Sequence, residues 1–216
     1  MSRSAAPTDC LFREDSYLKE CAALVVGLTE AGGIVLDRTV FYAASGGQPA
    51  DPGSLKTASG ATIPIAGVVF TDPGKTTIAH VPPPAAPAVA VGDTVKAAID
   101  WRIRHARMRM HTALHLLSAV LPYPVTGGSV GEAESRLDFD IPEAGLDKDA
   151  ITAKLAEMIA TDAGVSSPTA APIRDAFALA FVRITTIRFS RLGFARSTAS
   201  RRARPTVRSM PWGFGS

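Results

Sequence analysis

His111 and His115 are the residues whose type and spacing suggest chemistry most directly. They lie four positions apart, so on a helix their imidazoles project from one face, one turn apart. Two neutral imidazoles at this spacing can bind one zinc ion. Because Thr112 and not a glutamate follows the first histidine, the pair does not match the zinc metalloprotease pattern. The alternative is a pair of half-buried histidines on an amphipathic helix.

A glycine-rich loop, FYAASGGQPADPG at residues 41–53, is the second candidate site. Its Gly46 and Gly47 permit a tight turn with positive φ and a close approach of the backbone to a ligand. Gln48 then places an amide donor and acceptor at the turn. The alternative interpretation is a plain β-turn.

The remaining histidines and the second glycine-rich segment carry no comparable pattern. His105 lies six positions before His111 and falls on another helix face, so we expect a surface residue. His80 precedes a run of prolines and receives the same interpretation. The segment TGGSVG at 126–131 lacks the lysine of a phosphate-binding P-loop.

The segment that must position the glycine-rich loop is rich in strand signals. Between residues 22 and 99, short apolar runs alternate with Gly, Pro and Asp turn signals, which is typical of a small antiparallel barrel or sandwich. The proline-rich residues 81–89 should form a loop or an edge, because proline cannot donate a ladder hydrogen bond. The expected strands lie at residues 22–28, 33–42, 61–70, 77–81 and 94–100.

The histidine pair falls on a segment with helical periodicity that no Gly or Pro interrupts before Pro122. It predicts a helix over residues 101–121. Its arginines, Arg102, Arg104, Arg107 and Arg109, face either phosphate groups or solvent. The further expected elements are a strand at 135–142, a helix at 146–164 capped by Asp147 or Asp149, a strand at 177–190, and coil beyond it.

Composition excludes several classes of protein. The 216 residues are 46% apolar and 20% charged, which rules out a wholly disordered chain and a disulfide scaffold. No run approaches the roughly 20 apolar residues of a membrane span, and the first ten residues lack a signal-peptide core. With only Cys10 and Cys21, the chain is expected in the reducing cytoplasm.

The charge of the chain is uneven. The net charge is +3, yet no acidic residue follows Asp175, and eight arginines lie beyond it. Such a basic tail could bind nucleic acid, because arginine neutralises phosphates. It could equally be a solvated tail without a partner. A third interpretation is a frameshift after about residue 160, because GC-rich DNA read out of frame yields such an Arg-, Ser- and Ala-rich composition.

Four segments, taken in order, resemble the freestanding alanyl-tRNA editing proteins, which are similar to the editing domain of alanyl-tRNA synthetase. They are LFREDSYLKE, LDRTVFYAASGGQPADPG, RMRMHTALHLL and VTGGSVGEAESRLDFDIP, within residues 9–163. The resemblance implies an α+β protein, in which a small β-barrel precedes an editing domain with the H-x-x-x-H helix packed on an antiparallel sheet. The implied divisions are residues 1–100, 101–190 and an irregular tail at 191–216.

The resemblance also implies an activity. Proteins of this family hydrolyse the ester of tRNA(Ala) wrongly charged with serine or glycine. Their partner is therefore the acceptor end of tRNA, with no membrane and no obligate protein partner. Carried over by position, His111 and His115 would be zinc ligands, Thr39 would contact the serine hydroxyl, and Gln48 would end the glycine-rich motif as a second catalytic-site residue.

One departure from the family pattern concerns the metal. The family completes its zinc site with a later Cys and His, but this sequence has no Cys after Cys21 and no His after His115. Two ligands are half of the usual tetrahedral set, so we expect a weak or partial zinc site. The competing hypotheses are a non-catalytic tRNA-binding module and an inactive, frameshifted relative.

Overall fold

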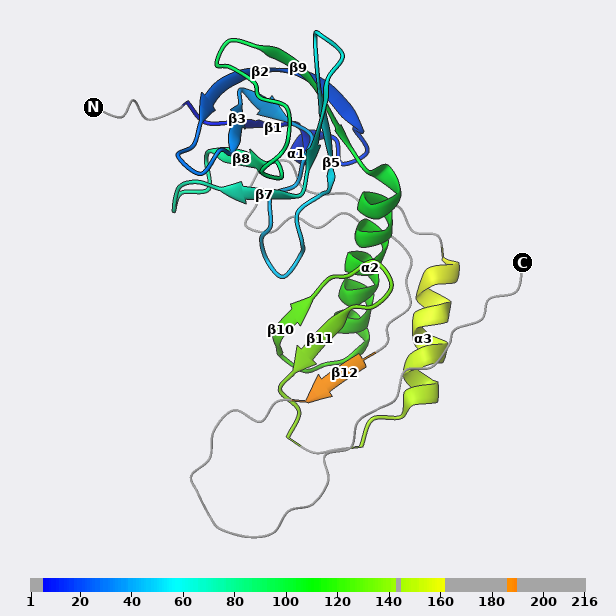
Figure 1. Ribbon diagram of the computed structural model, residues 1–216. Coiled ribbons are helices and arrows are strands. Elements are labelled where there is room, and N and C mark those ends of the chain that lie inside the picture. Colours follow the sequence, from blue (N-terminus) through cyan, green and yellow to red (C-terminus); the bar gives the residue numbers. More distant parts are fainter. Residues whose placement is uncertain (1–5, 143–144, 162–185, 190–216) are drawn as a thin grey trace, which may run out of the picture. The chain divides into compact units, whose positions relative to one another are not determined.

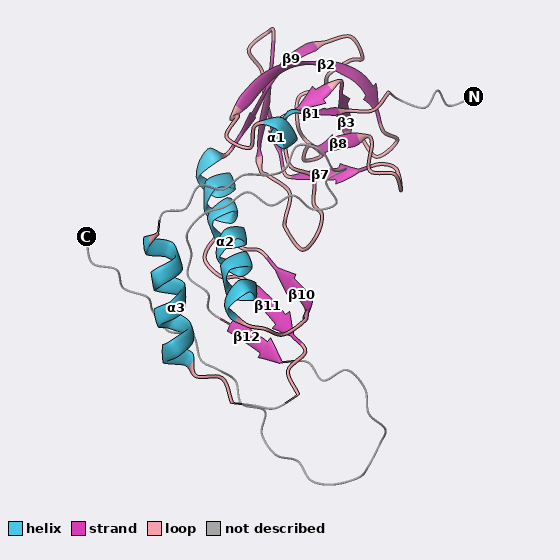
Figure 2. Ribbon diagram, turned by 180° about the vertical axis from the view of Figure 1, so that it is seen from behind, coloured by secondary structure: helices cyan, strands magenta, loops and turns pink. Residues whose placement is uncertain are grey.

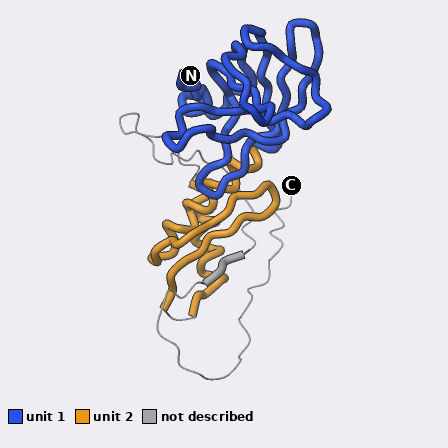
Figure 3. Tube along the Cα trace, turned by 60° about the vertical axis from the view of Figure 1, so that its left-hand side comes forward, with its two compact units in different colours: residues 1–104 blue, residues 105–216 orange. Residues whose placement is uncertain are grey.

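The computed structural model describes residues 6–142, 145–161 and 186–189 (Figure 1). It is a mixed fold of helices and strands, as expected. The chain divides into two compact units, residues 1–104 and 105–216, which Figure 3 distinguishes by colour. The predicted tail at 191–216, and the proposed frameshift with it, lie outside the described residues. Among the residues that are described, no helix is long and apolar enough to cross a bilayer.

Unit 1 is built on one antiparallel sheet of seven strands in the order β6-β5-β9-β2-β3-β8-β7. These strands are β2 (Glu20–Leu28), β3 (Ile34–Leu36), β5 (Gly53–Thr57), β6 (Thr62–Ile65), β7 (Gly67–Phe70), β8 (Ile78–Val81) and β9 (Thr94–Ile99). The edge strands β6 and β7 are separated by Ala66 alone, so the two edges meet at one corner and the sheet is nearly closed (Figure 1). A short helix, α1 (Leu11–Glu14), and the parallel pair β1 (Asp9–Cys10) and β4 (Arg38–Thr39) complete the unit.

Alternation of apolar and polar residues explains strands such as β9, whereas β3 is a continuous buried apolar run. In β9, Val95 and Ala97 are buried, whereas Thr94 and Lys96, which alternate with them, face solvent. All five expected strand regions contain strands, but the run at 33–42 holds two short ones, β3 and β4, and the run at 61–70 is split into β6 and β7. Strand β5 was not expected, because its sequence GSLKT has a single large apolar residue, Leu55, and follows an Asp-Pro-Gly turn signal. Of the proline-rich residues 81–89, Val81 ends β8 and residues 82–89 form a loop, as the prolines predicted.

Unit 2 combines a long helix with a small sheet. Helix α2 (Trp101–Val120) begins in unit 1 and continues into unit 2, and it is followed by β10 (Val125–Ser129), β11 (Arg136–Phe139), α3 (Lys148–Ala160) and β12 (Thr186–Phe189). Figure 2 shows α2 beside these strands, and Met110, Leu114 and Leu117 of α2 share a buried cluster with Leu137 and Phe139 of β11. The predicted cap of α3 is confirmed, since the Asp147 carboxylate accepts hydrogen bonds from Asp149 N and Ala150 N, each at 3.0 Å.

The sheet of unit 2 differs from the expected antiparallel one. Strand β11 pairs antiparallel with β10 but parallel with β12, so the sheet is mixed. A parallel neighbour requires a crossover connection, and the long segment between β11 and β12, which contains α3, provides it. The sequence of β12 alone carries no signal for the direction in which it pairs.

Candidate active site

The glycine-rich loop forms a tight hairpin turn in unit 1. Ser45 N donates to Gln48 O at 3.2 Å, and Gln48 N donates to Ser45 O at 2.9 Å. Between them, Gly46 and Gly47 have φ angles of 57° and 79°. Two consecutive positive φ angles are what a two-residue type I′ turn requires, and glycine adopts them without strain. The tight turn predicted from the Gly-Gly pair is therefore confirmed, and it is followed at once by the buried side chain of Gln48.

The two ends of this loop are held together at its base. Asp51 N donates to Tyr42 O at 3.1 Å, and Tyr42 N donates to the Asp51 Oδ2 at 2.7 Å. Further along the loop, Ala44 N donates to Val68 O of β7 at 3.0 Å, and the Tyr42 hydroxyl donates to Ser45 O at 3.1 Å. The loop is thus closed at its base and attached to the sheet, which restricts where Gln48 can lie.

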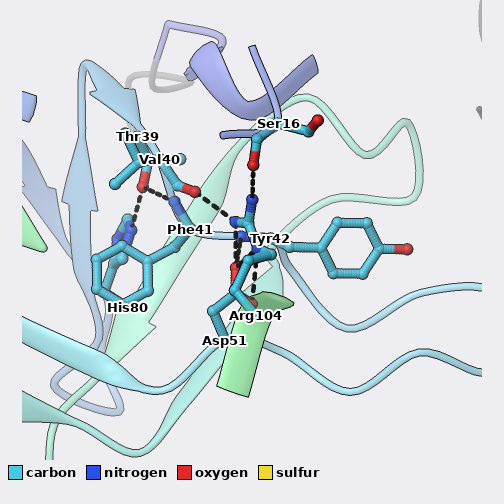
Figure 4. Close-up of polar contacts among 8 residues, drawn as sticks. All are labelled: Ser16, Thr39, Val40, Phe41, Tyr42, Asp51, His80 and Arg104. Carbon is cyan, nitrogen blue, oxygen red and sulfur yellow. Dashed lines mark hydrogen bonds and ion pairs between the residues drawn. The ribbon is translucent and has the colours of Figure 1, made fainter. Parts of the chain in front are cut away.

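A buried ion pair lies directly beneath the loop. The Asp51 side chain is 0% exposed and that of Arg104 is 4% exposed. Arg104 Nε donates to Asp51 Oδ1 and Oδ2 at 3.0 and 2.9 Å, and Nη2 donates to Oδ2 as well. The remaining contacts run to backbone carbonyls, from Nη2 to Val40 O at 2.7 Å and from Nη1 to Ser16 O at 3.1 Å (Figure 4).

The arginines at the start of α2 therefore do not form one surface. Arg104 and Arg107 are buried, and Arg107 pairs with Glu132 at 2.6 Å, so the expectation that all four face phosphate or solvent is wrong for these two. Arg102 and Arg109 are exposed. The sequence did not predict that Asp51 and Arg104 form a buried pair. The available signal was a carboxylate in a turn between apolar segments and an arginine on a largely apolar helix.

His80 is fully buried, so the expectation of a surface residue is wrong. Its strand β8 pairs with β3 and β7 inside the sheet, and its ring stacks edge-on against Phe41 at 5.2 Å between ring centroids. Burial lowers the pKa of His80 to about 4, so the ring is neutral at pH 7. His105, the other histidine expected at the surface, is half-buried.

The hydrogen bonds around His80 define its tautomer. His80 Nδ1 lies 3.0 Å from the Ile34 carbonyl oxygen, which can only accept, so Nδ1 carries the proton. Nε2 must then accept, and the Thr39 hydroxyl, 2.8 Å away, donates to it. Phe41 N in turn donates to Thr39 Oγ1 at 3.1 Å. Figure 4 shows the contacts that join His80, Thr39 and Phe41 beside the Asp51–Arg104 pair.

These contacts determine which hydrogen-bonding positions of the Thr39 hydroxyl are left for a substrate. Its hydroxyl proton and one acceptor position are used, so one acceptor position of the oxygen is left. Thr39 is also 0% exposed. A serine hydroxyl would have to donate to Thr39 Oγ1, and it would reach this oxygen only after the residues covering it move. The role that the resemblance implies for Thr39 stays a prediction.

The two histidines of α2 lie face to face, as the four-residue spacing predicts. Their ring centroids are 5.2 Å apart and the ring planes differ by 13°. His111 is buried and His115 is exposed. Burial, followed by the charge of His115, lowers the pKa of His111 to about 4, and burial also lowers the pKa of His115. Both rings are therefore neutral at pH 7, the form that binds metal ions.

This pair supplies two nitrogen ligands and no complete zinc site. In the part of the chain that the structure describes, no group of three or more His, Cys, Asp or Glu side chains is placed to hold a metal ion. Structural zinc sites take four ligands, and catalytic ones take three with a water molecule. The donors among the described residues do not fit the four-ligand zinc site that the resemblance implies, so we assign no chemical step to a metal.

Zinc binding by this chain is accordingly predicted to be weak. In a Zn²⁺ titration against a chromophoric chelator, the affinity should fall well short of the roughly 10–16 kcal/mol of structural zinc sites. His111→Ala and His115→Ala should each abolish the binding, whereas the control His105→Ala should leave it unchanged. Tight stoichiometric binding by the wild type would contradict the prediction.

Comparisons with known proteins connect this loop and helix to one family. The family model described as tRNA synthetases class II (A) matches residues 11–103, which include Thr39, Gln48 and Asp51. The alanyl-tRNA editing protein AlaX-M of Methanosarcina mazei is 40% identical over 169 residues, covering 74% of this chain and 66% of the relative. AlaX-M of Methanosarcina acetivorans is 37% identical over 164 residues, with 72% and 66% covered.

A much longer protein, an alanine–tRNA ligase, also matches part of this chain. The alanine–tRNA ligase of Pyrobaculum aerophilum is 39% identical over 137 residues, which are 63% of this chain but 14% of the ligase. The chain thus spans about 66% of the length of the Methanosarcina editing proteins and a small part of the ligase. On this identity and coverage, the chain belongs to the family of alanyl-tRNA editing proteins.

Proposed function

We propose that this chain hydrolyses the ester bond between tRNA(Ala) and a wrongly attached serine or glycine. The observation that carries the proposal is the glycine-rich loop, whose closed base and buried Gln48 lie in the segment that matches the family. The partner would be the acceptor end of tRNA. Cys10 and Cys21 are free thiols, which supports a cytoplasmic location for the proposed hydrolysis.

Ester hydrolysis requires a positioned water molecule and a polarised carbonyl group. An amide side chain carries two N–H donors and a carbonyl acceptor, and the Gly46-Gly47 turn fixes where Gln48 carries its own. We assign it to the ester carbonyl, whose oxygen gains negative charge as water attacks. An amide N–H is the kind of donor that stabilises such an oxyanion.

Thr39 is assigned to the choice of substrate. Its remaining acceptor position would take a hydrogen bond from the serine hydroxyl, which alanine and glycine both lack, so this contact accounts for the selection of serine alone. A site built to hydrogen-bond a hydroxyl discriminates against the analogue without it, because a buried polar atom would be left unpaired. His111 and His115 are proposed as ligands of a partly coordinated zinc ion, and no step of the reaction is assigned to that ion.

Single-turnover hydrolysis of Ser-tRNA(Ala) tests the role of Gln48. Loss of one oxyanion donor typically costs about 10²–10³ in rate, so Gln48→Ala should lower the rate constant by about that factor. The matched control is Ser45→Ala, in the same turn, which removes a hydroxyl that accepts a hydrogen bond from Lys75 Nζ at 2.9 Å. A rate for Gln48→Ala equal to that of the wild type would contradict the assignment.

A second candidate function is a non-catalytic tRNA-binding module. It is favoured by the incomplete zinc donor set of the described residues. A binding module would retain Ser-tRNA(Ala) without releasing serine, and its affinity would fall steeply with salt. Release of serine by the wild type separates these cases. Repeating the assay with His111→Ala and with a chelator then shows whether the release depends on a metal.

A further inference from the structure

We propose that the Asp51–Arg104 ion pair positions the glycine-rich loop by holding its base, Tyr42 and Asp51, and that it thereby holds Gln48 where ester hydrolysis needs it. The part that concerns hydrolysis rests on the proposed function. Both side chains are buried, at 0% and 4% exposed, and the contacts of their charged groups run to each other and to backbone atoms of unit 1. Their effect must be transmitted through the loop.

The carboxylate of Asp51 acts at the base of the loop. It accepts a hydrogen bond from Tyr42 N at 2.7 Å, while its own backbone N–H donates to Tyr42 O at 3.1 Å. Tyr42 and Asp51, at the base of the loop, are therefore joined by two hydrogen bonds. Because Asp51 Oδ1 and Oδ2 both also accept from Arg104, any rotation of the carboxylate that frees Tyr42 would break the ion pair too.

The guanidinium of Arg104 fixes this base to the rest of unit 1. Its other contacts go to Val40 O, just before the loop, and to Ser16 O in the N-terminal segment. Arg104 Cζ also lies 6.0 Å from the centre of the Phe12 ring, which packs edge-on against Tyr42. A planar fork that bonds three chain segments at once is a geometry that lysine cannot reproduce.

A purely structural ion pair and a positioning one respond differently when both charges are removed. Replacing both members of a buried pair with uncharged residues is often neutral or stabilising. The double variant Asp51→Asn/Arg104→Met should therefore fold, and the side-chain carbonyl of the introduced asparagine can still accept from Tyr42 N. It loses the link from the loop base to Val40 and Ser16, so only a positioning role predicts a local change in the loop.

Amide hydrogen exchange in the full chain tests this directly. In Asp51→Asn/Arg104→Met, we expect the amides of Ala44, Ser45 and Gln48 to lose about tenfold or more in protection, while the amides of β2 and β9 keep theirs. The matched control is Glu20→Gln/Lys96→Met, which removes an exposed pair with a 2.7 Å contact in the same unit. Loop protection that is unchanged, or that falls equally throughout unit 1, would overturn the proposal.

A second variant covers the case in which the double variant does not fold. Arg104→Lys keeps the charge opposite Asp51 but lacks the fork, so it should fold and still lose loop protection. Full loop protection in Arg104→Lys would count against the proposal as well.

The link to hydrolysis is tested by combining Arg104→Lys with Gln48→Ala. A displacement of about 1 Å at a reacting group can cost about a hundredfold in rate. We expect Arg104→Lys to lower kcat by about tenfold or more with little change in KM, and to have almost no effect once Gln48 is replaced by alanine. Additive losses would show that the pair does not act through Gln48. Absence of hydrolysis in the wild type would contradict the proposed function, whereas the exchange measurement would still test the positioning of the loop.

Discussion

Arg104→Met alone is expected to lower the free energy of unfolding by about 3–5 kcal/mol. The substitution leaves the carboxylate of Asp51, which is 0% exposed, without a counter-charge in the interior of unit 1. It also leaves Val40 O and Ser16 O without the donors that Arg104 supplies. An unpaired buried charge is among the most destabilising changes that one substitution can make. Urea unfolding at pH 7 measures the effect.

Two comparisons make this result specific to the buried pair. Asp51→Asn/Arg104→Met should recover the part of the loss that comes from the uncompensated charge, while Val40 O and Ser16 O still lack the donors of Arg104. Lys96→Met, which breaks the exposed contact with Glu20, should change stability by about 1 kcal/mol or less. A loss of about 1 kcal/mol or less for Arg104→Met would mean that the Asp51 carboxylate has another partner or that water reaches it.

The second large effect is a loss of stability in acid. His80 has a pKa of about 4 in the fold, against an ordinary value of 6.5. Between these values the unfolded chain binds more protons than the folded one, so stability rises with pH. The contribution of His80 is fully present above about pH 6.5 and is lost as the pH falls to about 4. A shift of this size corresponds to roughly 3 kcal/mol.

Unfolding free energies measured from pH 7 to pH 4 test this effect. His111, whose pKa is also lowered to about 4, should add a slope of the same sign. His80→Gln and His111→Gln should each reduce the slope, and the double variant should show the smallest slope. A His80→Gln protein with the full wild-type slope would refute the neutral, buried state of His80.

The parts of the fold that were predictable are those with local signals. The alternation in β9, the uninterrupted helical period of α2 and the Asp147 cap each depend on residues within one or two turns of chain. Strand β5 was missed because Leu55 is its one large apolar residue and its stability comes from pairing with β6 and β9 on either side. The direction of β12 was missed for a similar reason, since strand direction depends on the connection and not on the strand.

In the candidate site, too, the features set by local sequence were predictable and those set by distant contacts were not. The Gly46-Gly47 turn and the facing rings of His111 and His115 follow from spacing alone, and both are as predicted. The burial of His80 depends on β3 and β7, which pair with β8 on its two sides, and nothing in its neighbouring sequence shows this. Asp51 and Arg104 meet across 53 positions of sequence, so no local pattern could pair them.

The release of amino acid from tRNA(Ala) charged with serine, compared with the same tRNA charged with alanine, tests the proposed function most directly. The wild-type chain should hydrolyse Ser-tRNA(Ala) well above the spontaneous rate and leave Ala-tRNA(Ala) largely intact, because alanine has no hydroxyl to donate to Thr39. Thr39→Val should narrow this difference. Spontaneous rates for both substrates, at protein concentrations that bind the tRNA, would contradict the editing function and favour the binding module.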